Sequence, residues 1–261
     1  MSGARTSTVA TLRDSIERIE THDATYGSRK VPLGHAGADA SLQGGLALGA
    51  VHEVFAEAGR QSAVATGFVA GISGRMAARR PVVWIRQDFT EVEAGAVSMS
   101  GFSELGLDPR LLVSVHAADV DHALRTAADA LACDAVGAVV LEVWGEAGRL
   151  DLVASRKLTL AAQASGVTAL LLRLAATPQP STAESRWIVR AAHSPPSAEW
   201  GAPRFDAALV RNRHGPTGRW IMEWKCDECF FSETADPQPV AAAPAHRPHQ
   251  AGVVAGRRWA S

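Results

Sequence analysis

GGLALGAVHEVFAEAGRQSAVATGF, residues 44–68, joins a glycine-rich approach, an apolar strand, a turn and the start of a helix. We expect the strand at residues 50–55 and the helix at residues 61–79. One face of that helix would carry Ala65, Phe68, Val69, Ile72 and Met76. A strand, a turn and a helix in this order often cradle a phosphate group. The turn is therefore the first candidate for a nucleotide site.

The turn lacks the residues that a Walker A loop uses. Such a loop needs glycines, a lysine for the terminal phosphates and a hydroxyl for Mg²⁺. Gly59 is the only glycine between Phe55 and Val64, and GK[ST] occurs nowhere in the chain. Arg60 offers a cation of different geometry, and Glu57 has the wrong sign for a phosphate neighbour. We predict a degenerate loop without ATP hydrolysis, and weak nucleotide binding through backbone N–H groups stays open. The loop positions are Ala56, Glu57, Gly59, Arg60, Gln61 and Ser62.

Strands and helices alternate beyond this loop. Apolar runs predict strands at residues 81–86, 111–116, 137–143 and 167–174, and helices are expected at residues 120–133 and 151–165. Nearly continuous apolar strands are typical of a parallel sheet that is buried on both faces. After Pro180 the pattern alternates polar and apolar residues, with a turn at residues 214–218, which predicts antiparallel strands. The expected fold class is α/β, with a mostly parallel sheet and antiparallel C-terminal strands.

The two ends of the chain differ from this core. Residues 8–20 carry Val9, Leu12, Ile16 and Ile19 at helical spacing, and a polar stretch at residues 21–30 follows. We expect residues 1–30 to form an amphipathic helix and a linker, with the helix docked either on this protein or on a partner. Residues 31–230 form the expected core. Residues 231–261 are rich in Ala and Pro and are expected to be a disordered tail.

Composition excludes several classes of function. The chain has 261 residues, 47% of them apolar, 20% charged, and a net charge of −1, so it has no global attraction to nucleic acid or to an anionic membrane. The apolar run VTALLLRLAA is short and contains Arg173, and the N-terminus has no signal-peptide pattern, so we expect a cytoplasmic protein without membrane contact. Cys226 and Cys229 form a CxxC without a second pair or a histidine at finger spacing. We expect incidental thiols and no metal, with a metal or redox role as the less favoured alternative.

Two acidic residues follow or end predicted strands. Glu142 lies at the end of the strand at residues 137–143, in a position similar to Walker B, where a carboxylate often holds Mg²⁺ through water. A structural acid bonded to neighbouring backbone or to the region of Arg149 and Arg156 is an equal alternative. Asp88 follows the strand at residues 81–86 and is a candidate for orienting water. The chain contains no GxSxG, HExxH or GxGxxG, so we expect no catalytic residues.

Basic residues flank the last predicted hairpin. Arg211, Arg213 and Arg219 are candidates for a stripe that contacts DNA. Charges at an exposed strand edge also serve solubility, and this alternative stays open.

The order of these parts resembles the RecA-type ATPase core. The resemblance begins with PLG and LQGGLALGAVHEVFA and continues through VVWIRQD and GAVVLEVWG. The segments LDLVASRKLTLAAQASGVTALLLR, AESRWIVRAA and ALVRNRHGPTGRWIMEW are more specifically similar to the ImuA proteins of bacterial inducible mutagenesis cassettes. The likeness covers roughly residues 8–230, and the arginine- and serine-containing helix segment and the RNRxGxxGxWxxEW ending are fairly specific to that family.

The resemblance implies a RecA-like, P-loop-type core and an accessory role in SOS-induced, error-prone translesion DNA synthesis. Its implied partners are ImuB, RecA and an error-prone DnaE-type polymerase, the last contacted directly or through ImuB. The family is generally poor in Walker A residues, in agreement with the missing lysine. At residues 175–184, where recombinases carry a mobile DNA-binding loop, this chain has no basic residue and two prolines, so strong DNA binding by that loop is not expected. We favour a non-catalytic adaptor without a cofactor. The alternative is a residual ATPase or a DNA-dependent regulator that uses Arg60, Asp88 and Glu142.

Overall fold

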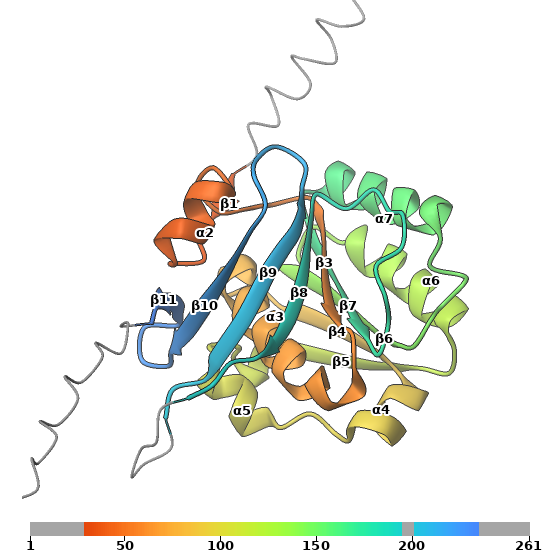
Figure 1. The fold of residues 1–261 in the computed structure, drawn as a ribbon. Coiled ribbons are helices and arrows are strands. Elements are labelled where there is room, and N and C mark those ends of the chain that lie inside the picture. Colours follow the sequence, from red (N-terminus) through yellow and green to blue (C-terminus); the bar gives the residue numbers. More distant parts are fainter. Residues whose placement is uncertain (1–28, 195–200, 235–261) are drawn as a thin grey trace, which may run out of the picture.

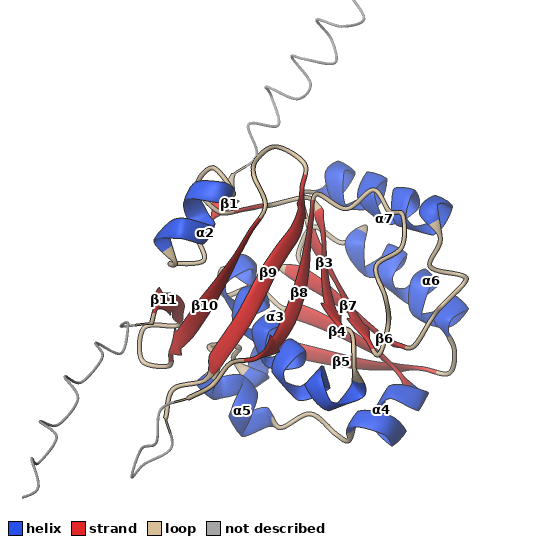
Figure 2. Ribbon diagram, viewed as in Figure 1, coloured by secondary structure: helices blue, strands red, loops and turns tan. Residues whose placement is uncertain are grey.

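The computed structural model describes residues 29–194 and 201–234 (Figure 1). The predicted helix with Val9, Leu12, Ile16 and Ile19 lies outside the described residues, as does the tail from residue 235 onward. The described part is a mixed α/β structure, built around one large sheet with helices on its two faces (Figure 2). None of its helices is long and apolar enough to cross a membrane.

Nine strands form the large sheet, in the order β11-β10-β9-β8-β3-β7-β6-β4-β5. The mutually parallel strands are β3 (Val51–Ala56), β4 (Val82–Gln87), β5 (Leu112–Ala117), β6 (Ala138–Trp144), β7 (Thr168–Leu174) and β8 (Ser185–Ala191). The antiparallel end of the sheet continues from β8 into β9 (Arg204–Asn212), β10 (Gly218–Lys225) and β11 (Phe230–Glu233). The prediction of a mostly parallel sheet with antiparallel C-terminal strands is confirmed for β9, β10 and β11. The strand directly after Pro180, β8, was also expected to be antiparallel, but it runs parallel to β3 and only its other neighbour, β9, is antiparallel to it.

The remaining elements are helices and a second, small sheet. The small sheet pairs β1 (Lys30–Val31) with β2 (Leu46–Ala47). The α-helices are α2 (Ala36–Ser41), α3 (Ser62–Ala77), α4 (Asp88–Ala94), α5 (Met99–Glu104), α6 (Val120–Leu131) and α7 (Leu152–Ser165). Two short 3-10 turns, η1 (Gly59–Gln61) and η2 (Pro109–Leu111), complete the set.

The sheet separates two hydrophobic cores. On one face, α3 packs with Phe68, Ile72 and Met76 against the apolar side chains of the strands and the C-terminal aromatic residues. On the other face, α6 and α7 cover β3, β4, β6 and β7 (Figure 1). Since both faces of β3, β6 and β7 are covered, these strands need the nearly continuous apolar sequence that predicted them.

Local sequence explains where α7 begins and ends. The side chain of Asp151 accepts a hydrogen bond from the backbone N–H of Ala154 at 2.8 Å and so caps the first turn. At the other end, Gly166 adopts the left-handed conformation with φ of +75°, which glycine takes without steric cost. This helix matches the prediction at residues 151–165 closely.

Two further sequence-based predictions need correction. The strand at residues 111–116 was expected to be buried on both faces, but β5 is the outermost strand and Val113 is 49% exposed. Its apolar run gave no sign of its place at the sheet edge. The core was also expected to end at residue 230, yet β11 extends to Glu233. Phe231 is fully buried against Phe68 and Trp224, so these aromatic contacts fix a strand that is too short to show periodicity.

Candidate functional site

The predicted degenerate loop follows the carboxyl end of β3. This strand lies between its parallel neighbours β7 and β8. Ala56 is the buried last residue of β3, and α3 begins at Ser62, so only residues 57–61 connect the two. Three of these five residues form the 3-10 turn η1. The predicted order of strand, turn and helix is present, and the carboxyl ends of parallel strands are where open α/β sheets place ligands.

The side chains of the loop are bound to the protein itself. Glu57 forms an ion pair with Arg190 at the end of β8. The amide oxygen of Gln61 accepts a hydrogen bond of 2.8 Å from the backbone N–H of Ala191. These two contacts tie the loop to β8, the strand next to β3, and they engage the side chains of Glu57 and Gln61 within the protein.

Trp144 lies against the only glycine of the loop. A Cβ atom at Gly59 would lie 3.1 Å and 3.2 Å from two carbon atoms of the Trp144 ring. In a phosphate loop, glycine lets the backbone approach the phosphate closely. Here the close approach is to an indole ring at the end of β6, so Gly59 serves packing.

The start of α3 keeps some ability to bind an anion. No side chain caps its first turn, and free N–H groups at a helix N-terminus favour negative charge. Arg60 is exposed beside this turn, whereas Ser62 is nearly buried. Arg60 is thus the one predicted loop position whose side chain remains open to solvent as a cation.

Glu142, the acid predicted to lie in a position similar to Walker B, is fully buried in an ion pair. Arg86 on the neighbouring strand β4 donates two hydrogen bonds to it, from Nε to Oε2 and from Nη2 to Oε1, both of 3.1 Å. The indole N–H of Trp84 donates a third hydrogen bond, of 2.6 Å, to Oε2. Glu142 is 0% exposed and Arg86 3% exposed. Both carboxylate oxygens are therefore engaged by side chains of the protein.

This arrangement answers the question that the sequence left open for Glu142. The geometry corresponds to the structural acid, although the partners are Arg86 and Trp84 and not the region of Arg149 and Arg156 that was considered from the sequence. A buried carboxylate needs a compensating cation and donors, and here both come from β4. A metal ion at this carboxylate would first have to displace a guanidinium group.

Asp88 does not share this site. It is the first residue of α4, and its side chain is 59% exposed. The neighbouring group is His116 at the end of β5, whose Nδ1 lies 3.8 Å from Asp88 and 3.4 Å from Glu91. Asp88 thus belongs to an exposed cluster of polar side chains at the end of β4 and β5, where its observed partner is a histidine.

The segment at residues 175–184, which was not expected to bind DNA strongly, is held against the core by hydrogen bonds. The carboxylate of Glu146 accepts hydrogen bonds from the backbone N–H of Thr177 at 2.8 Å, from its hydroxyl at 2.7 Å and from the amide of Gln179 at 3.2 Å. The hydrogen bond from the Thr177 hydroxyl is the main reason why the pKa of Glu146 is lowered. These three hydrogen bonds to one carboxylate tie the first half of the segment to the loop after β6.

Further contacts fasten the second half of the same segment. Arg186 on β8 forms an ion pair with Glu53 at 2.7 Å and donates to the hydroxyl of Ser181 at 2.8 Å. The backbone N–H of Thr182 donates to the hydroxyl of Ser155 on α7 at 2.9 Å. The contacts from β8 and α7 therefore add to the hydrogen bonds that Glu146 accepts.

Two of the three arginines proposed for DNA contact have partners within the protein. Arg211 donates to the backbone oxygen of Ser181 at 2.6 Å, and Arg219 forms a bidentate ion pair with Asp206. The pKa of Arg219 is raised, chiefly by its hydrogen bond to Asp206. The backbone N–H of Arg213 donates a hydrogen bond to the backbone oxygen of Glu184. The structure thus gives Arg211 and Arg219 roles within the sheet.

Sequence reasoning did not identify the residues that contact Glu142, the loop at residues 57–61 and the segment at residues 175–184. These residues are Arg86, Trp144, Glu146, Arg186 and Arg190. A signal was present for Arg86, because a charged residue at the end of the apolar run PVVWIR needs a partner when the strand is buried. No comparable signal marked Trp144 or Arg190, whose partners come from distant parts of the chain.

The cysteine pair lies in the turn between β10 and β11. The thiol of Cys229 donates to the backbone oxygen of Cys226 at 3.3 Å, and burial raises the pKa of the Cys226 thiol. Within residues 29–194 and 201–234, no group of three or more His, Cys, Asp or Glu side chains is arranged to hold a metal ion.

Neither the models of known protein families nor the curated proteins give a match to this chain.

Proposed function

We propose that this protein is a non-catalytic adaptor of the ImuA type, which acts in SOS-induced, error-prone translesion DNA synthesis. The observation that carries the non-catalytic part is the buried ion pair between Glu142 and Arg86. The acid that a RecA-type ATPase would use for Mg²⁺ is neutralised by an arginine of the next strand, and Trp84 adds a third donor.

The arrangement of the sheet supports a RecA-like core. The strand before the degenerate loop, β3, lies inside the sheet between β7 and β8, and β4 is separated from β3 by two strands. The loop follows the carboxyl end of β3, and Glu142 lies near the carboxyl end of β6. Both therefore lie on the side of the sheet where the parallel strands have their carboxyl ends. This is the placement expected of a P-loop-type fold whose nucleotide chemistry has been replaced by packing.

The proposed partners are ImuB, RecA and an error-prone DnaE-type polymerase in the cytoplasm, as the sequence resemblance implies. A protein that lacks phosphate and magnesium chemistry but keeps a large folded body would act through its surfaces. The fastened segment at residues 175–184 supports this proposal, because its hydrogen bonds to Glu146 and Arg186 leave it less free to follow a DNA strand.

The proposal is tested by two measurements on the purified full chain. A labelled ATP analogue is titrated with Mg²⁺ present, and binding to an ImuB-type protein is measured in parallel. We expect no saturation at micromolar nucleotide and a stable complex with the partner. Saturable nucleotide binding or ATP hydrolysis would refute the non-catalytic part. Absence of any complex with ImuB-type, RecA or DnaE-type proteins would refute the adaptor part.

A second candidate function is a regulator with residual nucleotide binding and DNA contact. It is favoured by the uncapped start of α3 and the exposed Arg60 beside it. Under this candidate, Arg60→Glu would abolish nucleotide binding, while the buried Glu142 would contribute nothing to it.

The DNA part of this candidate has its own test. The pair Arg211→Glu and Arg213→Glu would weaken binding of single-stranded DNA and lower its salt dependence if these residues contact phosphates. We expect no change in either quantity, because Arg211 is used within the fold. A clear loss of affinity at low salt would favour the regulator.

A further inference from the structure

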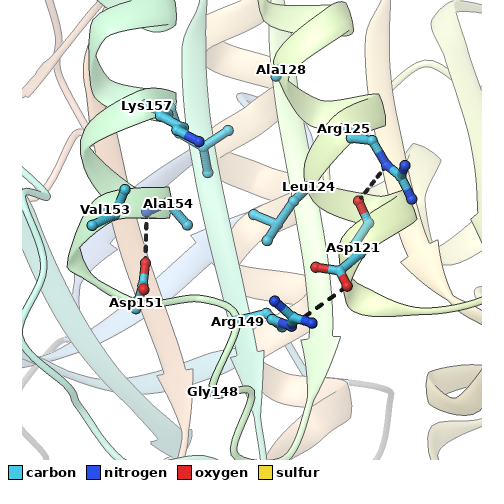
Figure 3. Close-up of a pocket in the computed structure, with 11 residues that line it drawn as sticks. Asp121, Leu124, Arg125, Ala128, Gly148, Arg149, Asp151, Val153, Ala154 and Lys157 are labelled. Carbon is cyan, nitrogen blue, oxygen red and sulfur yellow. Dashed lines mark hydrogen bonds and ion pairs between the residues drawn. The ribbon is translucent and has the colours of Figure 1, made fainter.

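A groove runs between α6 and α7 on the face opposite α3. It has a volume of about 600 Å³ and is shown in Figure 3. Its apolar side chains are Leu124 and Ala128 from α6 and Val153, Ala154 and Leu158 from α7. Leu158 is buried and belongs to the second core, and Leu124 packs against that core. The groove is therefore an apolar extension of this core toward solvent.

Charged side chains flank the groove. Arg149 lies 3.6 Å from Asp121 across one end, and Lys157 and Arg125 line the two helices (Figure 3). Asp151 is engaged as the N-terminal cap of α7. The groove combines an apolar floor with a rim of three basic and two acidic side chains, and an apolar groove of this kind is a site for an amphipathic helix.

The outer surface of α7 continues this apolar character. Leu152, Val153 and Leu160 are 52%, 60% and 52% exposed. Val153 and Leu160 are seven residues apart and therefore lie on one side of the helix, with Lys157 between them. A helix that packs along this side would cover Val153 and Leu160, two aliphatic side chains that now face water.

The chain itself supplies an occupant at the right place. The first described residue, Arg29, accepts a hydrogen bond of 2.9 Å from the N–H of Leu48 through its backbone oxygen. Gly49, the residue after Leu48, packs on the C-terminal end of α7. A Cβ atom at Gly49 would lie 3.2 Å from the Cα of Gly166 and 3.4 Å from the backbone oxygen of Ala162. The N-terminal segment thus enters the described structure beside α7.

The lengths also match. Residues 21–28 can span at most about 26 Å, which is more than the length of α7. A helix over residues 8–20 would be about 20 Å long, and α7, with its 14 residues, is about 21 Å long. The apolar stripe of residues 8–20 consists of Val9, Leu12, Ile16 and Ile19.

The charges of the segment suit the rim of the groove. Residues 8–20 contain two arginines and three acidic residues, which gives a net charge of −1. The acidic side chains of Glu17 and Glu20 flank the apolar stripe at helical spacing. Arg125 and Lys157 on the two sides of the groove provide the opposite charges.

From these observations we propose that residues 8–20 of the same chain dock as a helix along α7, with Val9, Leu12, Ile16 and Ile19 over the α6–α7 groove. This inference does not depend on the proposed function, because it uses only the groove, the exposed side chains of α7 and the point at which the chain enters the structure. Docking in the same chain gives the segment a high effective concentration at the groove.

Hydrogen exchange of the full chain, measured by mass spectrometry, tests the proposal. We expect the amides of residues 8–20 to exchange at least about tenfold more slowly than in an unstructured peptide. Leu160→Asp places a charge on the exposed side of α7 and is expected to remove this protection without unfolding the core. Ile16→Asp is expected to do the same from the side of the segment.

A matched control is Val92→Asp on α4, a helix that does not line the groove. Val92 is 80% exposed, so the same chemical change is made on an exposed helical position. This variant is expected to leave the protection of residues 8–20 unchanged. Thermal unfolding of all three variants checks that the core stays folded.

Three results would overturn the proposal. Residues 8–20 exchanging at the unstructured rate in the wild-type chain would show that the groove is not their site in the free protein. Protection that survives Leu160→Asp would place the segment elsewhere. Protection that rises with protein concentration, together with the mass of a dimer in sedimentation, would assign the groove to the segment of a second copy.

Discussion

Replacement of Arg86 by methionine tests whether the ion pair with Glu142 is a structural element. Arg86→Met keeps much of the apolar volume of the side chain but removes the cation. The carboxylate of Glu142 stays at 0% exposure, with the indole N–H of Trp84 as its remaining donor among the hydrogen bonds described. Loss of one partner from a buried ion pair costs about 3–5 kcal/mol, and the remaining Trp84 hydrogen bond favours the lower end, about 3 kcal/mol.

The assay is unfolding in urea, followed by tryptophan fluorescence. We expect the midpoint to fall while the slope of the unfolding free energy against urea stays constant, since the fold and its buried surface are unchanged. The control is Arg86→Met combined with Glu142→Gln, which removes both charges and keeps a carbonyl acceptor for Trp84. This double variant is expected to recover at least half of the lost free energy of unfolding.

Two outcomes would contradict this reasoning. The first is a free energy of unfolding for Arg86→Met within about 0.5 kcal/mol of wild type, the range of an ordinary surface substitution. The second is a rise of the wild-type midpoint on addition of Mg²⁺ that Glu142→Gln abolishes. That result would show that Glu142 exchanges its arginine for a metal ion.

Three further predictions concern other parts of the structure. Burial lowers the pKa of His52 from 6.5 to about 4 while its ring nitrogens bind Ser185 and Ala47, so its protonation favours the unfolded chain. The stability from neutral His52 is complete above the unfolded pKa of 6.5 and is lost as the pH falls toward 4, by about 2 kcal/mol between pH 7 and pH 5. Urea unfolding at the two pH values checks this, and a His52→Gln variant with an equally steep pH dependence would refute it. Gly45→Ala should destabilise far more than Gly44→Ala, because both have positive φ but only the Cβ at residue 45 would lie 2.2 Å from the backbone oxygen of Val31. Equal thermal midpoints for these two variants would contradict that close approach. Glu146→Ala should release residues 175–182, seen as faster hydrogen exchange and proteolysis of that segment with little change in the global unfolding midpoint. Unchanged protection of Thr177 would show that other anchors suffice.

Much of the fold could be predicted because it depends on local periodicity. The apolar runs that became β4, β6 and β7 and the amphipathic spacing that became α3 and α7 are properties of neighbouring residues. The edge position of β5 was not predictable in this way. An apolar strand at the edge and one in the centre have similar sequences, and only the strand order tells them apart. The short strand β11 carried too few residues for any period.

For the candidate site, the sequence by itself determined what is missing, and the tertiary structure decided what replaced it. The absence of a lysine, the single Gly59 and the acidic Glu57 are visible in residues 56–62 alone. The identity of the partner of Glu142 was not, because Arg86 lies 56 residues away and meets it only where β4 and β6 are neighbours. A buried charge needs a partner wherever it lies, so the sequence shows that a buried Glu142 needs one. Strand order, which follows from the packing of the whole sheet, decides which residue is that partner.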